Sequence, residues 1–421
     1  MGAFKAVVFW PAMNRLLVVI PTRNRARLAG AAVSSVLGQA VATRILVSDN
    51  STEPVESDEL HRYCAALDPA AVTYIRPSEP LAMTPHWEWA LQRGLEHGAF
   101  THVLFLTDRM VFKDHALAEI AQLVARHPER VISYNYDRVD DDRRPVVLEQ
   151  RDWTGKLFDI PSTQLLRLTA TAIIPPCMPR PLNAVMPVDV LAAVKRRFGS
   201  VFTSFAPDYA LAYRMLTVLD GILYYDAPAL VHYAQDRSNG TTYAKGIAAR
   251  DQVDFMANLG GALHNAAAPV PAFHVVTNPI FHEYGIAKAA AGPGRFPEVD
   301  RFQYLGMMDF DSRQIVNPEL AARTAALLRA NGWRRRDRLA WLLPRLAGYL
   351  RADPVGALTA AFRRPARFPT VEVALEYASQ HPRRARPNVR HFFIWFLFEP
   401  PGVVREVQAA SAPRIPLGRT A

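Results

Sequence analysis

The run LLVVI at residues 16–20 limits the possible folds more than any other feature, because five apolar residues follow one another and stop at Pro21. Such a run is typical of a strand buried on both faces, as in parallel sheets. Further strand-like runs lie at residues 44–47, 72–75, 102–106 and 131–136. Stretches with helical spacing separate them, at residues 27–39, 59–67, 85–97 and 115–127. This alternation predicts a Rossmann-like α/β fold with a mostly parallel sheet flanked by helices.

Polar residues follow the predicted strands at the points where the strands end. Pro21, Asp49, Arg76 and Asp108 each come just after one. In open parallel sheets, ligands bind beyond the carboxyl ends of the strands. The sequence therefore predicts that these four positions converge on one edge of the sheet and form a binding site there.

Composition restricts the class of protein. The 421 residues are 50% hydrophobic and carry a net charge of +10, which favours a folded protein with anionic partners. A solvated basic surface explains the charge equally well, and no basic–aromatic interleaving or zinc spacing supports nucleic-acid binding. Two distant cysteines, Cys64 and Cys177, indicate a reducing compartment. No apolar run reaches about 18 residues, which argues against a membrane span. Residues 1–15 are interpreted as a leader into the first strand, and FFIWFLF at 392–398 is expected to bury against the body.

The loop after the first strand, in VVIPTRNRARL, is rich in polar side chains. Thr22, Arg23, Asn24 and Arg25 precede a predicted helix, whose free N–H groups favour an anion. A polar helix cap with solvated arginines is the alternative. The loop lacks the glycines of a P-loop or a dinucleotide fingerprint, which excludes those motifs and argues against a nucleotidyltransferase.

The loop after the second strand, in ILVSDNST, begins with Asp49. Its carboxylate can accept a hydrogen bond from a base or a ribose, although an Asx turn is an equally simple explanation. Together, the two segments resemble the opening of the inverting family 2 glycosyltransferases, which transfer sugars from nucleotide-diphospho-sugars and have the GT-A fold. The segments PLAMTPHWEWAL and THVLFLTDRMVFKDHAL continue the resemblance, which covers roughly residues 14–240. It implies that Pro21, Thr22, Arg23, Asn24 and Asp49 bind the donor nucleotide.

The third motif, FLTDRMVF, departs from the family pattern of two or three acids. Asp108 matches the first acid, and Arg109 and Met110 stand in the later places. A lone carboxylate is a poor site for Mg²⁺ or Mn²⁺, so the resemblance leaves a metal cofactor ligated by Asp108 open. Asp108 is expected to orient the ribose, and Arg109 to offer positive charge to the leaving diphosphate. Three acids at 140–142 in RVDDDRRP are interpreted as a hairpin turn rather than a metal site.

The segment FAPDYALAYRML places Asp208 in the first turn of a predicted helix. The family carries a Glu–Asp pair there, whose second acid is the general base, and the resemblance assigns that role to Asp208. A plain acid at a helix start is the alternative, and Arg214 either orients Asp208 or faces solvent. In VHYAQDRSNG, His232 and Arg237 are candidates for contacts with the diphosphate, and a structural role for the histidine is as plausible.

The expected organisation is a GT-A-like domain at residues 14–245, followed by a mainly helical, basic C-terminal extension at 246–421. Residues 14–137 form its nucleotide-sugar half and residues 151–245 its acceptor half. The resemblance implies a hexosyltransferase-like enzyme that transfers a sugar from a UDP-sugar to a saccharide or lipid-linked acceptor, in bacterial surface polysaccharide or glycan synthesis. The expected location is the cytoplasm, with the basic extension either packed on the domain or lying on an anionic membrane. The alternative function is a non-catalytic nucleotide- or carbohydrate-binding protein on a degenerate GT-A fold.

Overall fold

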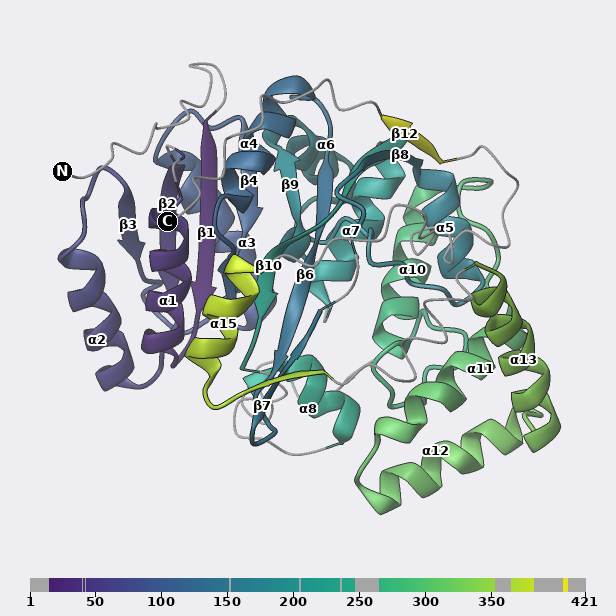
Figure 1. Ribbon diagram of the computed structural model, residues 1–421. Coiled ribbons are helices and arrows are strands. Elements are labelled where there is room, and N and C mark those ends of the chain that lie inside the picture. The colour runs from purple at the N-terminus through teal and green to yellow at the C-terminus, as the bar shows by residue number, and fades with distance from the viewer. Residues whose placement is uncertain are drawn as a thin grey trace.

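The computed structural model describes residues 15–39, 41, 43–150, 153–203, 206–234, 237–246, 265–352, 365–381 and 404–407. The predicted leader and the apolar segment at 392–398 lie outside this part of the chain. Figure 1 shows a central sheet with helices on both sides, and the helices between residues 278 and 352 gathered at one end. The predicted α/β fold with a sheet flanked by helices is confirmed.

The first half of the chain alternates as predicted. Its elements are β1 (Leu16–Thr22), α1 (Ala26–Leu37), β2 (Thr43–Asp49), α2 (Pro54–Ala65), β3 (Val72–Ile75), α3 (Met83–Glu96), β4 (His102–Phe105), β5 (Met110–Phe112), α4 (Ala116–Arg126) and β6 (Ile132–Asp140). The neighbouring strands β4, β1, β2 and β3 are parallel. Their carboxyl ends therefore lie along one edge of the sheet, as the sequence predicts.

The second half is more regular than the sequence suggests. It contains β7 (Val146–Glu149), β8 (Leu157–Pro161), α5 (Ser162–Ala170), a 3-10 turn at Pro181–Asn183, β9 (Ala184–Pro187), α6 (Val188–Phe198), α7 (Pro207–Val218), β10 (Gly221–His232) and α8 (Asn239–Lys245). Strand β9 pairs antiparallel with both β4 and β6, and β10 pairs parallel with β6. One continuous sheet thus joins the two halves of the region at residues 16–245.

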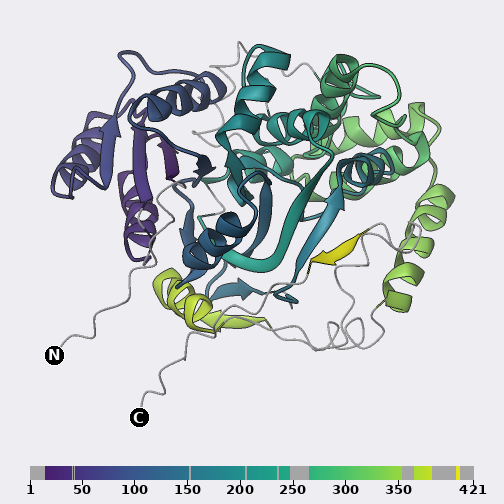
Figure 2. The same cartoon turned by 90° about the horizontal axis from the view of Figure 1, so that it is seen from above.

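The C-terminal extension is mainly helical, as predicted. It comprises α10 (Asn278–Ala291), α11 (Arg301–Asp311), a 3-10 turn at Ser312–Gln314, α12 (Pro318–Ala330), α13 (Arg335–Ala352), β11 (Ala366–Phe368), α15 (Val371–Gln380) and β12 (Arg405–Val407). Helix α10 packs on α7, and the short strands β11 and β12 pair with β7 and β8. Figure 2 shows that the chain returns to the sheet with α15 and β12 after its excursion through α10–α13. None of the described helices has the length and apolarity needed to cross a membrane.

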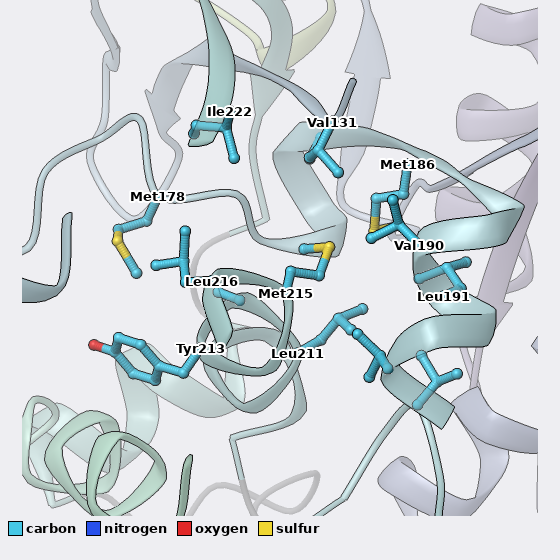
Figure 3. Packing of buried hydrophobic residues seen from close by; sticks show 14 of the residues in the cluster. Val131, Met178, Met186, Val190, Leu191, Leu211, Tyr213, Met215, Leu216 and Ile222 are labelled. Atoms are coloured by element: carbon cyan, nitrogen blue, oxygen red, sulfur yellow. The ribbon is translucent and has the colours of Figure 1, made fainter. Parts of the chain in front are cut away.

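Alternate side chains of β1 serve two separate cores. Leu17 and Val19 pack on one face of the sheet with α3, α6 and α7, whereas Leu16, Val18 and Ile20 pack on the other with α1 and α4. Both faces are buried, which is why the run LLVVI has no polar alternation. Figure 3 shows how side chains of α7 and α6 interdigitate with those of the sheet. This packing fixes the position of α7, whose first turn carries Asp208.

Candidate functional site

A cavity of about 870 Å³ lies at the carboxyl ends of β1, β6 and β10 and beside the first turn of α7. Predicted site residues that line it are Pro21, Thr22, Arg23, Asn24, Asp108, Arg109, Asp208, His232 and Arg237. These positions are spread over more than half of the sequence, and the sheet brings them together. Their convergence is observed, whereas their roles stay predictions.

Two predicted positions, Arg76 and Asp49, are not among those lining the cavity. The Arg76 guanidinium donates to the backbone carbonyl of Ser51 at 2.9 Å. The side chain of Asp49 is fully buried at the end of β2. One carboxylate oxygen accepts the backbone N–H of Ser51 at 2.9 Å, and the other accepts the hydroxyl of Tyr74 at 2.8 Å. The first contact is the Asx turn that the sequence allowed. In this structure, Asp49 stabilises the loop at residues 50–53 from the buried side, where it does not contact the cavity.

The loop after β1 is fastened to the loop after β2. Asn24 adopts a left-handed conformation with φ of 54°, which asparagine tolerates better than most residues. Its side-chain oxygen accepts the N–H groups of Thr52 and Glu53 at 2.8 and 3.0 Å, and its amide donates to the Thr52 hydroxyl at 2.9 Å. Asn24 thus links the loop after β1 to the loop after β2 by hydrogen bonds. Both loops form the same end of the cavity.

That end of the cavity also carries an uncharged histidine. His86, from α3, shares a hydrogen bond of 2.8 Å with the hydroxyl of Ser48, and its burial lowers its pKa to about 4. The adjacent Trp87 is largely buried and stacks on Phe105, so it belongs mainly to the core. Neutral hydrogen-bonding side chains, Asn50 and His86, line this end of the cavity together with the cation Arg23. Neutral groups of this kind can recognise a nucleobase through hydrogen bonds.

Asp108 is buried with its two carboxylate oxygens already engaged. One accepts the hydroxyl of Thr22 at 2.8 Å, and the other forms an ion pair with Arg25 at 3.3 Å. Arg25 also donates to the backbone carbonyl of Arg237 at 2.6 Å, which ties β1 to the loop after β10. Asp108 therefore serves as the anchor of an arginine in this structure.

Asp108, the candidate metal ligand, has both carboxylate oxygens engaged by protein side chains. In the described part of the chain, no three His, Cys, Asp or Glu side chains are grouped closely enough to hold one. The acids at 140–142 face different partners, because Asp140 pairs with Arg143, Asp141 accepts the N–H of Ala234, and Asp142 pairs with Lys245. These acids lie in the predicted hairpin between β6 and β7.

Arg109 and His232, which both line the cavity, contact each other. The Arg109 guanidinium donates to His232 Nε2 at 2.8 Å. Since arginine has no acceptor, Nε2 must accept, and the imidazole is neutral. Burial, with the charges of Arg109, Arg138 and Arg180, holds the pKa of His232 well below its ordinary value. His232 therefore stays uncharged at neutral pH and orients Arg109.

Arg138 stands next to this pair. It is the register partner of His232 between β6 and β10, and it lines the cavity. Its Nε is buried with no hydrogen-bond partner. A guanidinium in this position presents donors to whatever enters the cavity. The ends of three adjacent strands, β5, β10 and β6, therefore bring two arginines and a histidine side by side.

Asp208 lies at the other side of the cavity, at the second position of α7. Its pKa is raised by burial, which outweighs the opposing influence of Arg180 and of backbone N–H groups in the first turn. Arg180 lies over the rings of Tyr136 and Tyr209 and donates to the side chain of Asn183 at 3.1 Å. Asp208 is thus a half-buried carboxylate with enhanced basicity, facing a ligand-sized space.

Arg214 does not accompany Asp208. It is buried on the opposite side of α7, where its guanidinium donates to the backbone carbonyls of Ser200 and Val201 and lies over Phe198. Instead, the backbone before Asp208 is held by Glu283 of α10, which accepts the N–H of Ala206 at 3.2 Å. Support for Asp208 therefore comes from the C-terminal extension, and no motif in the sequence predicts this contact.

Two arginines that line the cavity, Arg138 and Arg180, were absent from the predicted site residues, whereas Arg25 was predicted as part of the anion-binding loop before the first helix. Arg138 follows the predicted strand at residues 131–136, so the rule that ligands bind beyond strand ends could have identified it. Arg180 lies in a proline-rich stretch with no periodic signal. With these residues, the cavity lining contains six arginines and one lysine against two aspartates. The site is therefore strongly cationic and suited to a ligand with several negative charges.

No protein-family model matches the sequence, and no curated protein matches it. Solved structures of S. aureus TarS are similar to this chain. One aligns with 75% of this chain and 53% of its own length at 10% identity and a TM-score of 0.40, so the chain spans about half of that TarS chain. TarS 1-349 aligns with 77% of this chain and 88% of its own at 12% identity and a TM-score of 0.40. TarS 1-349 in complex with UDP-GlcNAc aligns with 75% of this chain and 88% of its own length, at 11% identity and a TM-score of 0.40. The function of this chain is therefore inferred from its own side chains.

Proposed function

We propose that this protein is a glycosyltransferase that binds a nucleotide-diphospho-sugar in the cationic cavity and transfers the sugar to an acceptor hydroxyl. The observation that carries the proposal is one cavity lined both by six arginines and by Asp208, whose pKa is raised by burial. The arginines can bind a diphosphate, and a carboxylate of raised pKa can accept the proton of an acceptor hydroxyl.

The proposed position of the donor follows from the side chains at the strand ends. Asn50 and His86, beside the loops after β1 and β2, are the proposed contacts of the nucleoside. Arg109, Arg138 and Arg237 line the part of the cavity that continues towards the ends of β6 and β10. Guanidinium groups bind phosphate oxygens through paired N–H donors, so these three residues are the proposed diphosphate contacts. The sequence resemblance favours a UDP-sugar.

The proposed reaction is a single displacement at the anomeric carbon. Asp208 accepts the proton of the acceptor hydroxyl as its oxygen forms a bond to that carbon. The bond between the carbon and the diphosphate oxygen breaks on the opposite face, so the configuration inverts. The leaving nucleoside diphosphate gains negative charge, which Arg109 stabilises. His232 contributes by holding the Arg109 guanidinium in place with its 2.8 Å hydrogen bond.

No step of this proposal passes through a metal ion. The oxygens of Asp108 are engaged by Thr22 and Arg25, and the arginines supply the positive charge that a metal would otherwise provide. The proposed setting is bacterial surface polysaccharide or glycan synthesis on the cytoplasmic side, with a saccharide or lipid-linked acceptor. That setting rests on the resemblance of the sequence motifs.

The Arg25–Asp108 ion pair also favours a second candidate function. A chain whose acidic motif has become an arginine anchor can bind nucleotides without catalysing transfer. Such a protein would retain the cationic cavity and would have no use for a basic Asp208. Both candidate functions predict nucleotide binding, but only the glycosyltransferase predicts turnover of the nucleotide sugar. A measurement of turnover therefore separates them.

A thermal-shift panel of nucleotides and nucleotide sugars, each with Mn²⁺ and with chelator, tests the proposal. We expect one nucleotide-diphospho-sugar to raise the melting temperature equally in both conditions, and nucleoside diphosphate to be released from it when a bacterial glycan extract is added. Stabilisation that requires Mn²⁺ would contradict the metal-free site. Stabilisation without release would favour the non-catalytic binder, and no stabilisation by any nucleotide would overturn both.

A further inference from the structure

Helix α13 exposes a stripe of leucines, here called the leucine stripe: Leu339, Leu343, Leu346 and Leu350. Their exposed fractions are 59%, 58%, 49% and 46%. The spacing of four, three and four residues places them within an arc of about 60° when each residue advances by about 100°. Seven of the eleven exposed large hydrophobic residues among those the structure describes lie between positions 302 and 350. The α11–α13 region therefore differs from the rest of the described surface.

The opposite face of α13 holds the helix firmly on α11. Trp341 is 5% exposed and lies so close to Gly306 that a Cβ there would be 2.2 Å from its ring. Arg338 forms a bidentate ion pair with Asp309, and Arg345 lies over the Trp341 ring at 4.0 Å. This face of α13 is therefore held by both apolar and charged contacts with α11. The leucine stripe therefore takes no part in the packing of α13 on α11.

The charge around the leucine stripe is predominantly positive. Residues 318–352 contain eight arginines and two acidic residues. Arg335 and Arg336 are exposed at the start of α13, and they flank the stripe at the same helical spacing. An apolar stripe bordered by arginines is complementary to the boundary between acyl chains and anionic headgroups. A second copy of this chain would bring arginines against arginines, which disfavours a symmetric dimer through this face.

We propose that α13 docks this protein on an anionic lipid bilayer, with the leucine stripe in the interface and the arginines at the phosphate level. The helix lies in the membrane plane and does not cross it. The same C-terminal region also forms a wall of the cavity, because Gln314 and Val316, between α11 and α12, line it. Docking therefore brings a membrane surface to the element that borders the candidate site. This inference is independent of the reaction at that site.

Co-sedimentation of the full chain with vesicles tests the proposal. We expect binding to vesicles of phosphatidylglycerol and phosphatidylcholine, weak binding to pure phosphatidylcholine, and a large loss of binding between about 0.05 and 0.5 M salt, where screening becomes strong. The double variant Leu343→Ser, Leu346→Ser should bind anionic vesicles at least about tenfold more weakly, since two half-exposed leucines no longer enter the interface.

Val55→Ser provides the matched control, because Val55 is 76% exposed on α2 and lies outside the α11–α13 region. It should bind vesicles as the wild type does, and both variants should keep the wild-type melting temperature. The proposal is overturned if the double variant binds like the wild type, or if neutral and anionic vesicles bind equally. It is also overturned if the double variant abolishes a wild-type dimer in solution, because a second copy would then cover the stripe.

Discussion

Replacing Asp208 by asparagine removes one charge from the cavity and leaves the shape of the side chain unchanged. The structure places this carboxylate on the cavity wall with a pKa raised by burial. Loss of a general base typically lowers turnover by about 100- to 10,000-fold. This corresponds to about 3–5 kcal/mol of activation free energy, at about 1.4 kcal/mol per tenfold change. Donor binding should be unaffected, because the proposed donor contacts are arginines elsewhere in the cavity.

The same substitution should change the free energy of unfolding by less than about 1 kcal/mol, because two effects oppose each other. Asparagine avoids the cost of burying a carboxylate, but Arg180 loses a nearby negative charge while keeping its contacts with Asn183 and the tyrosine rings. A pKa raised by folding means that ionisation disfavours the folded state. The stability of the wild type relative to the variant is therefore greatest in acid and falls as the pH rises through the folded pKa.

Turnover is measured as nucleoside diphosphate released in the presence of acceptor, and donor affinity by calorimetry. Asp189→Asn is the matched control, because Asp189 is the second residue of α6 as Asp208 is of α7, and it is exposed. The control should have wild-type turnover. If Asp208→Asn also turns over near the wild-type rate, Asp208 is a plain acid at a helix start and the assignment of the base is refuted.

Three further outcomes follow from the same contacts. Arg109→Gln should weaken nucleoside diphosphate binding by about tenfold or more, because a charge-assisted contact is lost; equal affinity in calorimetry would place Arg109 outside the diphosphate site. Asp49→Ala should lower the free energy of unfolding by about 1–3 kcal/mol, since the buried Ser51 N–H and Tyr74 hydroxyl lose their acceptor; a denaturant titration superimposable on the wild type would contradict this. The rate should rise with pH as Asp208 loses its proton, with a midpoint above that of an ordinary aspartate; a rate that falls over this range would assign the titration to another group.

The sequence was sufficient to predict the first half of the fold because two patterns are strong there: continuous apolar runs for the strands and apolar residues at helical spacing for the helices. The run LLVVI becomes β1, and each helix that follows has a clear apolar face. The predicted site residues converge for the same reason, since parallel strands bring their carboxyl ends to one edge. Local pattern and global fold agree in this region, so short-range reasoning was enough.

Prediction was poorer where partners are distant in sequence. Strand β10 has mixed polarity, and its place beside β6 depends on pairing with residues about 90 positions away. The same applies to Arg25, whose ion pair with Asp108 joins two loops, and to Glu283, which supports the start of α7 from the C-terminal extension. A sequence shows which residues can carry a charge, but it does not show which charged residues will be close to one another in the folded protein.

The binding of uridine, UMP and UDP to the wild-type protein, measured by calorimetry in the presence of chelator, tests the central claim most directly. If the arginines form a diphosphate site, affinity should rise by about tenfold or more with each added phosphate and fall with salt, because each phosphate gains charge-assisted contacts. The series should be repeated with the nucleoside that gives the largest thermal shift. Equal affinities across the series, or binding that needs Mn²⁺, would contradict the account of a metal-free, arginine-lined nucleotide-sugar site.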